Sequence, residues 1–172
     1  MATHGNHLYK RGVLNMLSGN LGLPSQGASG SKNWICGLVN NTYSTAGGTV
    51  KLNNDQFYST ALGITPGQST GGNQIGNQIA LTNATASADI GTGIGIAIDA
   101  DDTVFTGVTV GSTVTGIVMF QSGTSGGAGT NDYLVSYWDE DDGSAISIVT
   151  NGGDITVQWN SDGIFMISGG VA

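Results

Sequence analysis

The sequence predicts an all-β protein: an antiparallel β-sandwich or jelly-roll-like domain with a short N-terminal helix or arm. The chain has 172 residues, of which 30 are glycine and only 2 are proline, and its short apolar runs are separated by glycine-containing turns. Such runs are typical of strands joined by tight turns. Charged residues make up only 9% of the chain, but 38% of its residues are hydrophobic. This composition is sufficient for a core, so we expect a folded domain.

One helical pattern lies near the N-terminus, at residues 7–18. The apolar residues Tyr9, Val13, Met16 and Leu17 recur at the spacing that places them on one face of a helix. A helix of this length is marginal by itself in water, so it must pack against another element.

The remaining sequence divides at about residue 32. Residues 1–32 contain the helix or arm and a loop of small residues, and residues 33–172 contain the β domain. Apolar or alternating segments of the β domain are the expected strands. They are residues 34–40, 49–52, 78–83, 93–100, 104–109, 114–122, 132–139, 145–150, 154–160 and 163–168.

The last three of these segments are separated by turn sequences, Asn-Gly-Gly at 151–153 and Ser-Asp-Gly at 161–163. Asn-Gly and Asp-Gly pairs favour tight turns because both residues tolerate positive φ. Between the turns, Ile155, Val157 and Trp159 alternate with polar residues, so one face of this strand is expected to be buried. The sequence therefore predicts an antiparallel meander at the end of the chain.

Charge changes sign along the chain. The four cations, Lys10, Arg11, Lys32 and Lys51, precede all 12 acidic residues. Nucleic-acid binding by the β domain is not expected, because phosphate contacts require cations. The basic start could instead contact an acidic surface on a partner or on a sister subunit. No secretory signal pattern and no apolar run long enough to cross a bilayer are present, so we expect no membrane contact.

An acidic turn near the end of the chain is the one candidate for a metal site. Asp139, Asp141 and Asp142 could supply oxygen ligands to a weakly bound Ca²⁺. However, the position at which a helix-loop-helix calcium loop needs a bidentate glutamate is Thr150. A solvated turn is the simpler interpretation of this charge run.

Catalytic signatures are absent from the sequence. Nucleophilic triads need a histidine, and only His4 and His7 are present, both near the N-terminus. The single cysteine, Cys36, lies in an apolar run and is expected to pack as a small hydrophobic residue. The Gly-x-Gly-x-Gly run at 91–95 lacks the helix and the lysine of a nucleotide-binding loop. We therefore expect no enzymatic activity and no cofactor.

Both ends of the sequence carry a recognisable pattern. Residues 8–23, LYKRGVLNMLSGNLGL, follow the pattern LYxxGxxxLLxGxxxL, with Met16 at the first of the paired leucines. Residues 151–165, NGGDITVQWNSDGIF, follow the pattern NGGDxTxQWxxxGI. In these segments, and in ADDTVFT at 100–106, the chain resembles a family of small virion proteins of tailed phages, of the capsid decoration or cement type.

Two further segments, 114–120 and 133–138, are similar to that family in order and spacing, whereas residues 32–93 depart from its pattern. The resemblance implies a β-sandwich or jelly-roll domain in the virion, on the capsid surface, where it locks neighbouring subunits of the major capsid protein together. Members of that family are often homotrimers, so the resemblance also implies a homotrimer. It implies no catalytic residue.

The basic N-terminal helix suits an arm that docks on an acidic neighbour. The expected partner-binding residues are Tyr9, Val13 and Leu17 as apolar anchors, together with Lys10 and Arg11.

Two other functions are compatible with the sequence. One is a tail or head-fibre domain that binds a host-surface glycan. The other is a free carbohydrate-binding or glycan-cleaving module, in which Asp99, Asp101, Asp139 and Asp141 would be the candidate residues, since glycosidases require paired carboxylates in one cleft. Exposed tryptophan and tyrosine rings could line a sugar-binding face, but packing in the core is the simpler role for them.

Overall fold

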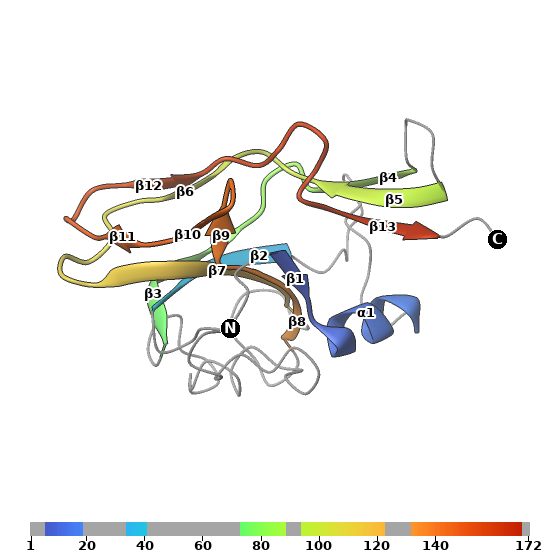
Figure 1. The fold of residues 1–172 in the computed structure, drawn as a ribbon, viewed down its shortest axis with the longest axis horizontal. Helices are drawn as coiled ribbons and strands as arrows, with labels where there is room; N and C mark the ends of the chain where they lie inside the picture. The colour runs from blue at the N-terminus through green and yellow to red at the C-terminus, as the bar shows by residue number, and fades with distance from the viewer. Residues whose placement is uncertain (1–5, 19–33, 41–72, 89–93, 123–131, 170–172) are drawn as a thin grey trace.

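A computed structural model of the chain describes residues 6–18, 34–40, 73–88, 94–122 and 132–169. It confirms the predicted class: antiparallel strands form two layers, and one short helix lies at the end of the larger sheet (Figure 1). The predicted strand at 49–52 and the predicted domain boundary at residue 32 lie outside these residues.

The helix and the strands have the following bounds. The helix is α1 (Lys10–Leu17), and the strands are β1 (Asn6–Leu8), β2 (Trp34–Asn40), β3 (Gln74–Ala80), β4 (Thr85–Ala88), β5 (Ile94–Asp99), β6 (Thr103–Phe105), β7 (Thr113–Gln121), β8 (Tyr133–Trp138), β9 (Glu140–Asp141), β10 (Ser144–Ala145), β11 (Ile148–Val149), β12 (Ile155–Val157) and β13 (Phe165–Gly169).

The larger layer is a sheet with the strand order β1-β8-β7-β2-β3, in which β11 also pairs with the start of β7. Its inner strand β2 is apolar in almost every position, and residues 34–39 are all buried. A strand that is buried on both faces carries such a continuous apolar run instead of an alternating one. The second layer consists of two smaller sheets, β13-β5-β4 and β12-β6 (Figure 1).

The predicted C-terminal meander is wrong. The strands β11, β12 and β13 pair with β7, β6 and β5 respectively, so one long antiparallel ribbon runs through both layers. Backbone hydrogen bonds continue the ribbon between its strands, from Ile164 N to Ile98 O (2.7 Å) and from Val108 N to Gly153 O (3.0 Å). The turns at 151–153 and 161–163 do form, but they bend the ribbon and do not reverse the chain into hairpins.

The N-terminal helix is shorter than predicted. It begins at Lys10 instead of residue 7, because the preceding residues form the strand β1 on the edge of β8, in the register His7↔Tyr137. Tyr9 is the N-cap in an extended conformation, and its backbone N–H donates to Val135 O at 2.9 Å. A free sheet edge offers these amides partners that the frayed first turn of a helix does not.

Strand β3 begins earlier than predicted. The expected strand began at residue 78, but the residues before it also pair with β2, through Ile75↔Leu38. The register shifts between Cys36 and Leu38, and Gly76 has φ +66°. Glycine permits this positive φ, so an irregularity of this kind resembles a loop in sequence.

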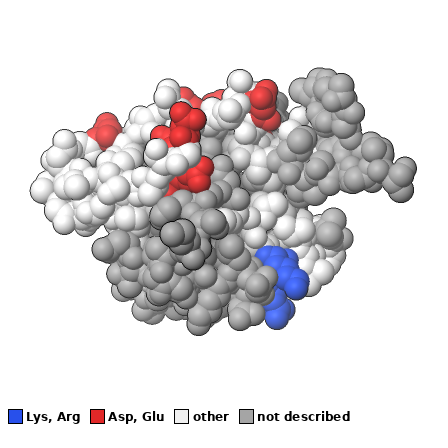
Figure 2. Space-filling model, viewed as in Figure 1, with Lys and Arg blue, Asp and Glu red and all other residues white. Residues whose placement is uncertain are grey.

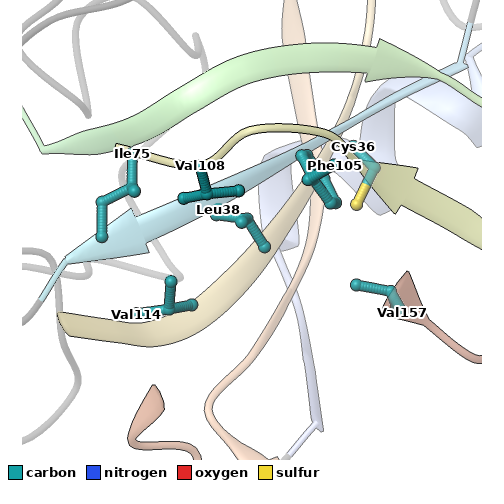
Figure 3. Close-up of a cluster of buried hydrophobic side chains, with 7 residues drawn as sticks. All are labelled: Cys36, Leu38, Ile75, Phe105, Val108, Val114 and Val157. Carbon is teal, nitrogen blue, oxygen red and sulfur yellow. The ribbon is translucent and has the colours of Figure 1, made fainter. Parts of the chain in front are cut away.

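The two layers enclose two adjoining clusters of buried side chains. The first contains Trp34, Ile98, Met119, Val135, Trp138 and Ile164. The second, shown in Figure 3, contains Cys36, Leu38, Ile75, Phe105, Val108, Val114 and Val157. Both clusters draw on β2, on β7 and on the C-terminal part of the ribbon, so the ribbon and the central sheet stabilise each other.

The close approach of α1 to β8 requires a glycine at position 12. A Cβ atom there would overlap the carbonyl oxygen of Leu134 and lie 3.0 Å from the Cα atom of Val135. We expect Gly12→Ala to lower the free energy of unfolding by about 1–3 kcal/mol, because the helix must move off the sheet. This expected value is the net change, after the gain of about 1 kcal/mol in helix propensity that alanine brings. Urea denaturation measures it.

The control for this substitution is Arg11→Ala, in the same helix at an exposed position. It should change stability by no more than about 0.5 kcal/mol. A Gly12→Ala variant as stable as the wild type would show that α1 does not need this contact.

Two buried groups make stability sensitive to alkaline pH. Burial raises the pKa of the Cys36 thiol, and burial followed by the Asp139 carboxylate raises the pKa of the Tyr137 hydroxyl. The folded chain therefore keeps both protons at a pH where the unfolded chain loses them. The contribution of Cys36 is fully present below about pH 9 and that of Tyr137 below about pH 10; above these values each group lowers the free energy of unfolding by about 1.4 kcal/mol per pH unit.

Urea denaturation between about pH 8 and about pH 10.5 measures this loss, because free cysteine and tyrosine titrate in this range. We expect the decline with pH to be shallower in Cys36→Ala, because one of the two groups is removed. The packing defect of this variant is a constant offset at every pH. Equal slopes for the variant and the wild type would contradict the assignment.

Candidate functional site

The described charges lie on separate parts of the surface. Lys10 and Arg11 are exposed on α1, whereas the acidic side chains lie over β9, the adjoining turns and the second layer (Figure 2). The described basic and acidic side chains, which are separated along the sequence, are therefore also separated in space, with the basic ones beside the larger sheet.

The five expected partner-binding residues do not share one surface. Tyr9 has no exposed area, Val13 is half-buried, and the side chain of Leu17 lies outside the described residues. Lys10 and Arg11 are exposed, and Leu14, which was not expected there, is 57% exposed. The burial of Tyr9 follows from its place between β1 and α1, where its backbone also bonds to β8.

Lys10, Arg11 and Leu14 form what we call the α1 outer face. Leu14 is four residues from Lys10 and three from Arg11, so the three side chains are neighbours on the helix surface. The helical apolar pattern did not reveal Leu14, because this residue lies off the stripe that faces the sheet. An exposed leucine flanked by two cations is suited to contact an acidic surface that contains an apolar depression.

Two lettered positions of the sequence pattern LYxxGxxxLLxG have structural roles in this chain. Tyr9 is fully buried, and Gly12 allows contact between α1 and the backbone of β8. The three residues of the α1 outer face all occupy free positions, written x, in that pattern. In this chain, the lettered positions Tyr9 and Gly12 therefore serve the packing of the segment.

The C-terminal pattern likewise describes packing against residues 100–106. Trp159 N donates to Asp102 Oδ1 at 3.0 Å, and its ring Nε1 donates to Thr103 Oγ1 at 3.2 Å. One strand of the ribbon thus carries the ADDTVFT segment and the other carries the QW pair. These two parts of the resemblance are one structural unit, since β6 pairs with β12.

A cavity of about 480 Å³ lies beside β12, and we call it the β12 groove. Its lining is about equally polar and apolar, and it includes Trp138 and Trp159, whose ring centroids lie 5.6 Å apart. Three acidic residues, Glu140, Asp141 and Asp142, also line it. The remaining lining residues are Leu38, Val114, Ile117, Ile146, Ile148, Ile155, Thr156, Val157, Gln158, Asn160, Gly163 and Ile164.

The acidic turn is a tight hairpin between β9 and β10. Asp142 and Gly143 at its tip have φ values of 46° and 79°, the left-handed conformation of a type I′ turn. Asp141 and Asp142 are exposed, whereas Asp139 is only 2% exposed, so the three calcium candidates differ in environment. Within the described parts of the chain, no three His, Cys, Asp or Glu side chains are placed to hold a metal ion.

The candidate carboxylates of a glycan site do not share the groove. Among Asp99, Asp101, Asp139 and Asp141, only Asp141 lines it. Asp101 Oδ2 instead accepts a hydrogen bond from Asn83 Nδ2 at 2.7 Å. Glu140, which was not among the candidates, is a lining residue, and its position in an acidic run was the only signal for it.

Comparison with known proteins identifies no relative of this chain. No family model, curated protein or solved structure matches the chain. In the described residues, no helix is long and apolar enough to cross a membrane.

The hydrogen bond between Trp159 and Thr103 generates a stability prediction. Thr103 is buried, so Thr103→Val leaves the Trp159 Nε1–H without its acceptor. We expect a loss of about 1–2 kcal/mol in the free energy of unfolding, measured by urea denaturation. The matched control is Thr156→Val on the paired strand, an exposed position where the same change should be nearly neutral. Equal effects at both positions would refute this role for Thr103.

Proposed function

We propose that this chain is a structural, non-catalytic protein of a tailed-phage virion. It decorates the outside of the head and binds the major capsid protein through the α1 outer face. The observation that carries the proposal is the exposed basic and apolar surface on α1, set apart from an otherwise acidic molecule. The resemblance of the terminal segments to capsid decoration proteins supplies the identity of the partner.

The α1 outer face is held on a rigid support. Tyr9 bonds to β8 immediately before the helix, and Gly12 brings the helix against the same strand. A surface that is already ordered loses little conformational entropy when it binds. This property suits a protein that must reinforce a shell and not merely attach to it.

Charge orients the bound protein. With formal net charge −8, the molecule as a whole is repelled by an acidic shell, and only the α1 outer face offers described cations to it. The protein would therefore dock with α1 inward and its acidic turns outward. Such an arrangement leaves the acidic surface free.

Avidity explains why a homotrimer would serve this function. The α1 outer face contains only Lys10, Arg11 and Leu14, so a single copy is expected to bind weakly. Joining three copies raises the effective concentration of the second and third contacts without any new interaction. We therefore propose a homotrimer on the capsid surface.

A glycan-binding function has less support from the groove. Trp138 is only 7% exposed and packs against Trp159 with ring centroids 5.6 Å apart, so little of its face is accessible. Sugar rings need an accessible aromatic face together with several polar partners. The groove fits an apolar side chain better than it fits a sugar.

The test is co-sedimentation with empty heads of the phage that encodes the chain, using Lys10→Gln combined with Arg11→Gln. We expect binding at least about tenfold weaker than that of the wild type, because two charge contacts are lost. Wild-type binding should also weaken as salt rises, since salt screens exposed charges. Light scattering of the same samples measures the trimer.

The matched control is Thr106→Glu combined with Thr109→Glu, two exposed positions away from α1. Removing two positive charges or adding two negative ones takes the formal net charge from −8 to −10 in both variants. Equal weakening by both would show that only net charge matters. Failure of the wild type to bind these heads would overturn the proposal.

A further inference from the structure

We propose that the β12 groove binds an extended, basic segment of a partner protein, which adds to the free edge of β12 as a further strand. This inference goes beyond the proposed function and does not depend on it, because it uses a different surface and holds whether or not the partner is a capsid protein.

The groove follows a strand edge. Its lining includes the consecutive residues 155–160. Neighbouring side chains of a strand point to opposite faces, so a consecutive run of this kind lines a groove most readily along the edge of the strand. Within the described chain, β12 pairs with β6 alone, and its other edge has no strand beside it.

An unpaired edge presents backbone N–H and C=O groups that an extended peptide can pair with. Natural edge strands are commonly protected by being very short, or by a lysine, a proline or a bulge. Residues 154–160 have the sequence DITVQWN, which contains neither lysine nor proline, and the pairing of β12 with β6 is regular. Within the described residues, this edge therefore carries no lysine, proline or bulge against an incoming strand, and the shortness of β12, Ile155–Val157, limits the pairing to a few residues.

The floor of the groove suits the alternating side chains of such a strand. Five isoleucines line the cavity: Ile117, Ile146, Ile148, Ile155 and Ile164. Its volume of about 480 Å³ exceeds that of a single side chain. An added strand would point every second side chain toward this apolar lining, which specifies apolar residues at alternate positions.

The acidic residues select the charge of the occupant. Glu140, Asp141 and Asp142 line the groove, and Asp141 and Asp142 are exposed. A lysine or arginine beside the apolar residues of the peptide would lie near these carboxylates, whereas an acidic peptide would be repelled. The same carboxylates oppose edge-to-edge pairing of two copies of this chain, because each copy would bring an acidic groove to the other.

The experiment uses the full chain and two short synthetic peptides. One alternates valine with lysine and threonine, and the other has glutamate in place of lysine. Binding is followed by isoleucine methyl NMR shifts and by amide exchange at residues 155–158. We expect the lysine peptide to shift the lining isoleucine methyls and to protect some of these amides, and the glutamate peptide to do neither.

The matched variants test the acidic side of the groove. Glu140→Gln with Asp141→Asn should weaken binding of the lysine peptide at least tenfold, in line with the loss of close charge pairs. The control, Asp101→Asn with Asp162→Asn, changes two exposed carboxylates outside the lining and should bind as the wild type does. Both variants change the formal net charge from −8 to −6, since each removes two negative charges.

Three outcomes would overturn the inference. The lysine peptide could fail to bind, the two variants could bind it equally, or a long-chain alkylammonium ion could shift the same methyls while the lysine peptide protects no amide of β12. The last outcome would assign the groove to small amphiphilic cations. Head binding by the α1 variants is scored separately, so failure here leaves the proposed function untouched, and the reverse also holds.

Discussion

The antiparallel ribbon in which β5, β6 and β7 pair with β13, β12 and β11 is the constraint on which the rest of the structure depends. One strand of this ribbon, β7, also pairs with β2 and β8 and so belongs to the centre of the larger sheet. The ribbon thereby fixes the position of the second layer over the first. The cores, the groove beside β12 and the sheet edge that receives β1 all follow from this pairing.

Local signals in the sequence predicted most of the strands but not their partners. The run at residues 34–40 became β2 with the same bounds, because a continuous apolar segment is favourable only where it is buried. The turns around Gly152 and Gly163 were also predicted, and both residues have positive φ. Turn residues specify the local backbone, however, and do not determine whether the flanking strands pair with each other or with an earlier ribbon strand.

The candidate surfaces show the same limit. The apolar stripe of the N-terminal segment was predicted, but the stripe faces the sheet, so Tyr9 is buried and Leu14 is exposed instead. Distinguishing these two requires knowing which side of α1 meets β8. The β12 groove had no local signal, because a strand edge, a hairpin and a distant floor residue such as Leu38 combine to form it. Of its lining residues, only Trp159 and the acidic run were singled out in the sequence, and nothing there indicated that they lie together.

The edge pairing of β1 with β8 also determines the order in which the molecule can be completed. Asn6 lies opposite Trp138, so the N-terminal strand is synthesised first but has no partner until β8 has emerged and formed its own sheet. Pairing between such distant positions in the chain requires the closure of a long loop, which slows folding. The helix that follows β1 is consequently displayed in its final orientation only on a molecule whose central sheet is already built. A truncated or misfolded copy would lack this surface, which gives any assembly that recognises it a means to select complete subunits.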